Sequence, residues 1–529
     1  MRFSLLVLLV CFSFYLHLSH LSSIPPALLD HELRLGLATQ HIQVAMTGIA
    51  PLAVLITFPF VKLFGLTALA IRLPSALFGC LGIILFYFFA LEVYLFLKER
   101  LTVMTSPSHE RIFSFFPLLA SLFFAFSPWH IQVARMDVGI QAGLFFFLLG
   151  LYLLLKFSGS LKLPMLWTIP LVLSIYADYS FFLPSVFVIF SVLLLKRQSL
   201  RQFPLFTGGG ILLGFLLLLP LFPHAIAYVT HPDDTNVYLA AENEHLSQER
   251  VLYSGNTELS KLLFAPQVEN LKLFFNHLSA YLEPSQLFIL WGKSSSYISP
   301  FSGLLYPTDL LFLLAGVFFL IQSSAAIFLL VLLWVSVVLL PLAFTTSAVD
   351  PLRASLLLPV IALLLSFGSL FLLIRLPKKH RWLAAGCTAG VFAYFFLRFL
   401  YTYFVVFPEK TIDYPPEYAQ ALSYTIDAFQ NTQPVIVTDA TYGKNTYLSL
   451  LFMSKNALPP VTAFPVQKTL IKRISQYGNY SFVSEPPLSY AKNILYIQPT
   501  LTVPKQSTII LYRSSSPDKK YQITVFTMQ

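Results

Sequence analysis

The sequence predicts a polytopic α-helical membrane protein, and three observations support this fold class. Only 11% of the 529 residues are charged, whereas 57% are hydrophobic, and the mean hydropathy is +0.73. Soluble globular chains carry about 25% charged residues, so the composition excludes one large water-soluble enzyme, a disordered chain and a coiled coil. Long apolar runs and an uneven distribution of basic loop residues are the other two observations.

The apolar runs predict about eleven transmembrane helices, because a helix needs about 20 apolar residues to cross the hydrocarbon layer. The first run starts after Arg2 and has no clear small-residue cleavage site, which favours an uncleaved first helix over a signal peptide. The predicted spans lie in Phe3–Leu18, Leu73–Leu97, Ile112–Phe126, Gly139–Leu155, Leu163–Ile175, Phe181–Leu195, Phe203–Pro220, Leu304–Ile321, Ala325–Phe344, Leu356–Ile374 and Trp382–Phe407.

Basic residues in the short loops predict the orientation, since cytoplasmic loops collect lysine and arginine. With the N-terminus in the cytoplasm, the loops that fall inside carry most of the cations, and the C-terminus ends outside. The net charge of +10 is then a feature of membrane topology, which argues against nucleic-acid binding. The inside cations are Lys98, Arg100, Arg111, Lys156, Lys162, Lys196, Arg197, Arg201, Arg375, Lys378, Lys379 and Arg381.

Three stretches within or after the predicted membrane domain (1–407) do not span, and all three face outward in this topology. They are a first external loop (22–72), a large polar loop (223–303) and a tail (408–529). Residues 50–65 within the first loop are apolar but short, which is typical of an interfacial helix. The tail predicts a small α/β domain, with a helix over 415–429 and strands over 434–438, 493–497, 508–512 and 522–526.

Ionisable residues crowd the start of the first external loop. Asp30, His31 and Glu32 follow the two prolines that end the first helix. Asp30 is an expected N-cap of a new helix, where acids also interact favourably with the helix dipole. Polar groups at a membrane boundary are costly unless they are used or paired, so a general base or acidic ligand is the functional alternative.

Two outward arginines are candidates for binding an anionic group. Arg135 follows the predicted third span and could hold a headgroup or pair with Asp137, while Asp178 in a later turn is expected to be structurally paired. Arg353 precedes the tenth span, where it could bind phosphate bidentately or pair with Asp350 or Asp309. Trp129 is expected to be an interface anchor.

The sequence shows no clear disulfide, metal-binding, nucleotide-binding or nucleophile motif. Cys11, Cys80 and Cys387 all lie inside apolar runs, so a disulfide framework and a zinc site are not expected. No two histidines on one element have metal-ligand spacing, and no P-loop, dinucleotide fingerprint or nucleophile elbow stands out. No cofactor is required, although acids close together are compatible with a divalent metal ion.

Several strings together resemble the GT-C membrane glycosyltransferases, specifically the dolichyl-phosphate-mannose protein mannosyltransferase superfamily and its bacterial relatives. The resemblance is colinear over about residues 1–400, and the second and third strings are the most distinctive. The strings are Ile24–Glu32, Pro59–Thr67 with Arg72–Gly79, Ser127–Arg135, Gly303–Tyr306 and Pro351–Pro359.

The resemblance implies a plasma-membrane enzyme that takes a sugar from a polyprenyl-phosphate carrier and transfers it, with inversion, to a hydroxyl of a protein, lipid or glycan. It implies that Asp30 or His31 is the base, with Glu32 as its support or as a sugar ligand. It also implies that Arg135 and Arg353 bind the carrier phosphate. The family places an Asp-Glu pair in the first loop; aligning Glu32 with that Glu puts His31 at the Asp position and Asp30 one residue early.

Two alternatives follow from this altered motif and from the scaffold. One is a non-catalytic protein that binds the lipid carrier or assists assembly on the same scaffold. The other is a transporter or flippase, which predicts charged residues and broken helices in the middle of the membrane. Apart from Glu92, Arg398 and Asp178 at a boundary, the predicted spans carry almost no such charges.

Overall fold

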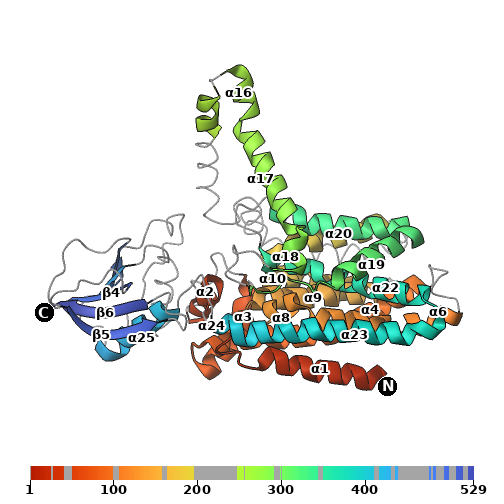
Figure 1. The fold of residues 1–529 in the computed structure, drawn as a ribbon, viewed down its shortest axis with the longest axis horizontal. Helices are drawn as coiled ribbons and strands as arrows, with labels where there is room; N and C mark the ends of the chain where they lie inside the picture. The colour runs from red at the N-terminus through yellow and green to blue at the C-terminus, as the bar shows by residue number, and fades with distance from the viewer. Residues whose placement is uncertain are drawn as a thin grey trace. The chain divides into compact units, whose positions relative to one another are not determined.

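A computed structural model gives the fold (Figure 1), and the chain divides into two units. One unit comprises Met1–Ser19 and Ser75–Leu400, and the other comprises His20–Pro74 and Tyr401–Gln529. The predicted division of the chain at residues 407 and 408 stays a prediction. The residues that the structure describes are 2–25, 28–40, 50–98, 107–157, 164–195, 247–254, 257–290, 298–299, 301–343, 350–409, 416–429, 435–438, 476–477, 480–483, 494–499, 508–515 and 522–528.

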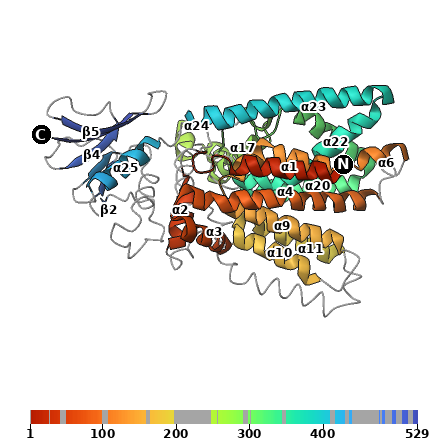
Figure 2. The same ribbon diagram turned by 90° about the horizontal axis from the view of Figure 1, so that it is seen from below.

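The first unit is a bundle of apolar helices that run side by side in both views (Figures 1 and 2). Hydrocarbon offers no hydrogen-bond partners, so apolar segments satisfy their backbone groups within helices. The bundle helices are α1 (Arg2–Leu18), α4 (Ala68–Lys98, which begins in the other unit), α6 (Pro107–Phe113), α7 (Phe116–Phe126), α9 (Val138–Lys156), α10 (Pro164–Ala177), α11 (Phe182–Leu195), α19 (Asp309–Ser323), α20 (Ala325–Ala343), α22 (Leu358–Arg375) and α23 (Lys378–Tyr401).

Every predicted span that falls on described residues overlaps a helix, and Phe203–Pro220 lies outside those residues. The predicted span Leu304–Ile321 is helical only from Asp309, and Ile112–Phe126 is divided between α6 and α7. Within the described part, six helices are long and apolar enough to cross a membrane. They are Ala68–Lys98, His109–Phe126, Val138–Lys156, Ala325–Ala343, Pro351–Arg375 and Lys378–Val406. The chain is therefore an integral membrane protein, as predicted, while the number of eleven spans and the orientation of the termini stay predictions.

Two glycines allow a close contact between α19 and α22. A Cβ atom added at Gly316 of α19 would meet the carbonyl oxygen of Leu364 in α22, and one added at Gly368 would meet that of Phe312. Small residues let two membrane helices approach backbone to backbone, which maximises packing where water provides no driving force. Phe367 fills the space beside this contact, with its ring centroid 4.3 Å from that of Phe116.

Further helical elements of this unit lie outside the set of bundle helices. Four of these helices begin with proline at the first helical position, where its missing N–H costs nothing. They are α8 (Pro128–Val133), α17 (Pro266–Tyr281), α18 (Pro284–Phe288) and α21 (Pro351–Ala354); the others are η1 (Tyr179–Phe181), α16 (Glu258–Leu263) and η3 (Ser355–Leu357).

The second unit contains the first-loop helices α2 (Asp30–Gln40) and α3 (Pro51–Phe64), the start of α4, the π-helical turn η4 (Thr402–Val406) and α24 (Phe407–Glu409). The helix predicted over residues 50–65 forms as α3; its interfacial location stays a prediction.

The tail forms the predicted α/β arrangement. Helix α25 (Pro416–Phe429) and strands β1 (Val435–Thr438), β4 (Leu495–Pro499), β5 (Thr508–Ser515) and β6 (Gln522–Met528) occur where they were expected, and β2 (Gln476–Tyr477) and β3 (Tyr480–Val483) were not predicted. The strand order is β2-β3-β1-β4-β6-β5. β1 is parallel to β3 and β4, whereas β6 is antiparallel to β4 and β5. α25 packs on this sheet and buries Ala421 and Leu422.

Candidate functional site

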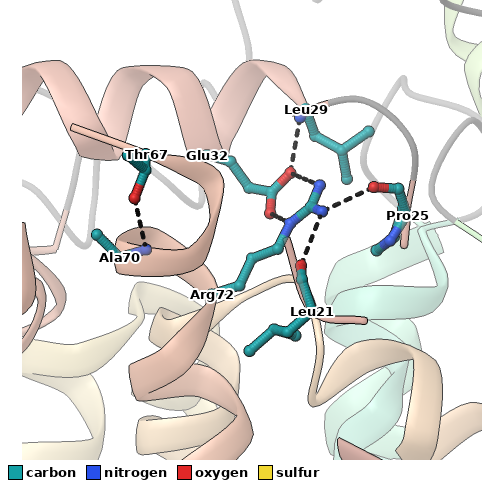
Figure 3. Close-up of polar contacts among 7 residues, drawn as sticks. All are labelled: Leu21, Pro25, Leu29, Glu32, Thr67, Ala70 and Arg72. Atoms are coloured by element: carbon teal, nitrogen blue, oxygen red, sulfur yellow. Dashed lines mark hydrogen bonds and ion pairs between the residues drawn. The ribbon is translucent and has the colours of Figure 1, made fainter. Parts of the chain in front are cut away.

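Glu32 forms a buried ion pair with Arg72 (Figure 3). The Nε atom of Arg72 donates to Oε1 of Glu32 at 2.6 Å, and Nη2 donates to Oε2 at 3.2 Å. Both side chains have no exposed surface. Oε2 also accepts the main-chain N–H of Leu29 at 2.7 Å. Such a bidentate guanidinium–carboxylate pair is stronger than a single hydrogen bond between neutral groups.

The same guanidinium holds the chain that precedes α2. Its Nη1 atom donates to the carbonyl oxygens of Pro25 at 2.7 Å and Leu21 at 3.4 Å (Figure 3). Arg72 lies in the first turns of α4, whose start is capped by the Thr67 hydroxyl accepting the Ala70 N–H. Arg72 therefore fixes the first loop both before and after Asp30.

The structure places the three first-loop candidates differently. Asp30 is the first residue of α2, and its side chain lies outside the described part of the structure. His31 is partly buried, whereas Glu32 is fully buried and engaged by Arg72. This arrangement favours the supporting role of Glu32 over that of a sugar ligand.

Arg135 is fully buried at the C-terminal end of α1. Its Nη1 atom donates to the carbonyl oxygens of Leu16 at 2.6 Å and His17 at 3.1 Å, and Nη2 donates to that of Ser19 at 2.7 Å. The last carbonyls of a helix have no intrahelical partner, and a cation there also interacts favourably with the helix dipole. Arg135 thus caps α1, and any effect it has on a phosphate would act through that helix end.

The segment that begins at Ser127 joins distant parts of the bundle. The main-chain N–H of Trp129 donates to the Leu304 carbonyl at 3.1 Å, and its indole Nε1 donates to the Pro351 carbonyl at 2.7 Å. The Gln132 side chain accepts the Ser299 N–H at 2.7 Å. Trp129 is only 1% exposed, so the expectation of an interface anchor is wrong: the indole N–H is used inside the protein, where it positions α21.

Arg353 lies in α21 as a partly exposed cation. Its Nε atom is 3.4 Å from Oδ2 of Asp350, and 22% of its side chain is exposed. Asp350 caps α21 through Oδ1, which accepts the Leu352 N–H at 2.9 Å, while its own N–H donates to the Tyr281 hydroxyl at 2.8 Å. The predicted alternative pairing with Asp350 is therefore present, and part of the Arg353 side chain stays exposed beside it.

Two further carboxylates lie together beside Gly139. A Cβ atom at position 139 would be 2.9 Å from the Ala177 carbonyl oxygen, 3.2 Å from Oδ1 of Asp137 and 3.5 Å from Oδ2 of Asp178. Asp137 caps α9 through the Ile140 N–H at 3.1 Å, and Asp178 caps η1 through the Ser180 N–H at 2.8 Å. Asp137, Asp178, Asp350 and Arg353 are called the Arg353 cluster below.

Electrostatics connect Asp178 to the other members of the cluster. Burial raises the pKa of Asp178, the Asp137 carboxylate raises it further, and the Arg353 guanidinium acts in the opposite direction. The net upward shift favours the protonated form of Asp178.

Gly139 is expected to be essential for the close packing of α9 against the Ala177 carbonyl group. Gly139→Ala should lower the stability by about 1–3 kcal/mol, because the new Cβ would press on a main-chain oxygen that cannot rotate away. The measurement is the thermal midpoint of the detergent-purified protein, followed by size-exclusion chromatography. Gly386→Ala is the control, since a Cβ there meets nothing within 4 Å. Equal midpoints for the two variants would contradict the expectation.

Asp178→Asn should stabilise the protein at neutral pH. The raised pKa means that ionising this carboxyl disfavours the folded state, so its penalty grows as pH rises from the ordinary value of 3.8 through the raised value. Asparagine keeps an oxygen for the Ser180 N–H and carries no charge. The thermal midpoint of the variant should exceed that of the native protein at pH 8, and the difference should shrink as pH falls. A variant that melts earlier at pH 8 would refute this sign.

No group of three histidine, cysteine or acidic residues is placed to hold a metal ion among the residues that the structure describes. The possibility of a divalent metal therefore stays a prediction.

The sequence did not identify the role of three of these residues. Arg72 appeared only within a family string, although an arginine directly before a long apolar run was a signal of a buried partner. Gly139 lies at the start of α9, and the structure shows that the neighbouring Asp137 and Asp178 meet there. Asp178 is not simply paired as expected, because its nearest charges include another carboxylate.

Comparison with solved protein structures supports the fold, whereas comparison of sequences finds no match. No family model and no curated protein sequence matches the chain. A solved structure, ArnT from Cupriavidus metallidurans bound to undecaprenyl phosphate, matches with a TM-score of 0.52 and 11% identity. The match covers 98% of this chain and 97% of that one. The chain therefore has the GT-C fold of ArnT, in agreement with the GT-C-like architecture predicted from the sequence.

Proposed function

We propose that the protein is a membrane glycosyltransferase that moves a sugar from a polyprenyl-phosphate donor to an acceptor hydroxyl. The observation that carries the proposal is the likeness to ArnT over nearly the whole chain, since that protein was crystallised with undecaprenyl phosphate. A partly exposed arginine at the end of the bundle is the second support. Only the sequence resemblance supports the finer details of the proposal, which are the mannosyltransferase subfamily, the sugar and the acceptor.

In the proposed reaction, a base in the first loop removes the proton of the acceptor hydroxyl. The acceptor oxygen then attacks the anomeric carbon, and the bond from that carbon to the phosphate oxygen breaks. The electron pair of this bond leaves with the carrier phosphate, and the configuration at the anomeric carbon is inverted. Asp30 or His31 is the base, and Arg353 offsets the charge that develops on the departing phosphate.

The other predicted residues have positioning roles in this proposal. Glu32, held by Arg72, fixes the main chain beside Asp30. Arg135 holds the end of α1. Trp129 holds the start of α21, so that Arg353 keeps its place near the end of the span. Each of these residues is buried, so each would act through the backbone it fixes.

The second candidate is a protein that binds the lipid carrier without catalysis. The buried ion pair between Glu32 and Arg72 favours this candidate, because it gives Glu32 a structural role in place of a catalytic one. The two candidates share Arg353 as the phosphate ligand and differ in whether Asp30 or His31 acts as a base.

Asp30→Asn separates the two candidates. The purified protein in vesicles is incubated with a panel of radiolabelled polyprenyl-phosphate sugars and acceptors, and transfer is measured. Loss of a general base should slow transfer by about 10²–10⁴-fold while the thermal midpoint and the binding of polyprenyl phosphate stay unchanged. If the Asp30→Asn variant still transfers sugar, the base is His31 and not Asp30. The His31→Gln variant is then tested in the same way. Native protein that binds the carrier and transfers nothing across the panel would establish the binding protein.

A further inference from the structure

Helix α17 leaves the bundle sideways. In Figure 1 it stands at a large angle to α20, α22 and α23, and in Figure 2, turned by 90°, it points along the line of sight. Residues 247–253 and α16 lie with it: the ion pair between Arg250 and Glu269 measures 2.5 Å, and the Ser247 hydroxyl donates to the Phe264 carbonyl. We call residues 247–254 and 257–282 the side arm.

One face of the side arm is apolar and exposed. Val268, Leu271, Phe275 and Leu282 are 44%, 55%, 56% and 53% exposed. Their spacings of three, four and seven residues place them on one face of a helix; we call them the apolar stripe. At the tip, the exposed apolar residues are Leu252, Tyr253, Leu259, Leu262 and Leu263. An exposed apolar surface of this kind marks a site of interaction with protein or membrane.

The side arm is anchored where a membrane span begins. Tyr281 is buried at the C-terminal end of α17, and its hydroxyl accepts the N–H of Asp350, the cap of α21. α21 leads directly into the span Pro351–Arg375. The foot of α17 therefore lies at the boundary between hydrocarbon and headgroups, and a helix transverse to the spans at that depth runs along the membrane surface.

The apolar stripe also continues onto surfaces that face lipid. Beyond Leu282, Ile289 and Leu290 are exposed by 62% and 50%, and Leu311 and Leu314 of the apolar helix α19 by 60% and 61%. Two exposed lysines of the side arm belong to ion pairs within their own helices: Lys272 of α17 with Glu269 at 4.0 Å, and Lys261 of α16 with Glu258 at 2.8 Å. The methylene groups of such lysines cover apolar surface while their charged ends stay at the level of water and headgroups.

We propose that the side arm lies on the membrane with its apolar stripe in the boundary between the headgroups and acyl chains of phospholipids. The occupant is lipid because the arm runs transverse to the spans, starts at their end and continues their apolar surface. In this position the arm widens the footprint of the protein on the membrane beside the Arg353 cluster. The proposal concerns contact with bulk phospholipid and does not depend on glycosyl transfer.

The test measures which medium each face of α17 contacts. Cys11 and Cys387 are exposed and are replaced by alanine, whereas Cys80 is buried and stays. Single cysteines replace Leu271 and Phe275 on the stripe, or Asn270 and Asn276 on exposed polar positions of the same helix. Each variant of the full chain is spin-labelled and reconstituted in vesicles of phosphatidylethanolamine and phosphatidylglycerol. Collision rates are then measured with oxygen, which concentrates in lipid, and with a water-soluble nickel chelate.

Labels at Leu271→Cys and Phe275→Cys should collide more with oxygen than with nickel, and labels at Asn270→Cys and Asn276→Cys should show the reverse. Nickel collisions that dominate at all four positions would place the stripe in water and overturn the proposal. Labels on the stripe that are shielded from both reagents would also overturn it, because protein would then cover the stripe. Since the labelled positions are all exposed, the native fold is expected in every variant, and the size-exclusion profile verifies it.

Discussion

Replacing Arg353 with glutamine is expected to weaken the binding of polyprenyl phosphate by about 10- to 100-fold, the size of one hydrogen-bonded charge contact. Arg353 is a partly exposed cation at an end of the bundle, and its helix α21 is held by the Trp129 indole. Glutamine keeps hydrogen-bond donors and loses the charge. Binding is measured by the quenching of intrinsic tryptophan fluorescence as short-chain polyprenyl phosphate is added.

Arg375→Gln is the matched control for that measurement. Arg375 ends α22, so it lies at the opposite end of the same span, and it is exposed and stacks on Phe371. Its replacement should leave the affinity unchanged. If both variants bind polyprenyl phosphate as the native protein does, Arg353 is not the phosphate ligand. If both weaken it equally, the effect is one of general charge.

Glu32→Ala is expected to be the most destabilising single change in the first loop. It removes the carboxylate that pairs with the buried Arg72 guanidinium, and breaking a fully buried ion pair costs about 3–5 kcal/mol. The Leu29 N–H loses its acceptor as well. The thermal midpoint of the purified protein and its sensitivity to protease within residues 20–32 should both report the change.

Glu258→Ala provides the comparison with an exposed ion pair. Glu258 is 90% exposed and pairs with Lys261 at 2.8 Å, and exposed pairs contribute about 0–1 kcal/mol. The same substitution should therefore have little effect there. Midpoints that fall equally for Glu32→Ala and Glu258→Ala would mean that the Glu32–Arg72 pair does not hold the loop.

The positions of the helices could be predicted because lipid leaves the backbone few choices. An apolar run such as residues 139–155 must satisfy its own hydrogen bonds, so its length and composition predict α9. The strands of the tail followed from alternating and β-branched residues, as in β6. The two-residue strand β2 was too short for such a pattern.

The contacts that build the candidate site could not be predicted in the same way. Glu32 and Arg72 are 40 residues apart, and Trp129 and Pro351 are 222 residues apart. Such pairs depend on how helices pack, which local periodicity does not encode. Sequence reasoning could identify Glu32 and Arg353 as ionisable groups near a membrane boundary. It could not decide that the first is fully buried in an ion pair while the second stays partly exposed.

Phosphorus NMR of a polyprenyl-phosphate sugar mixed with the native protein in vesicles tests the proposed function most directly, because one spectrum reads both binding and turnover. The donor is a phosphodiester, and sugar transfer releases the carrier as a phosphomonoester with a separate resonance. With the correct acceptor present, the phosphodiester signal should decline as the phosphomonoester signal grows, and Arg353→Gln should slow the conversion. A phosphodiester signal that broadens on binding and never converts, with any sugar or acceptor of the panel, would contradict glycosyl transfer.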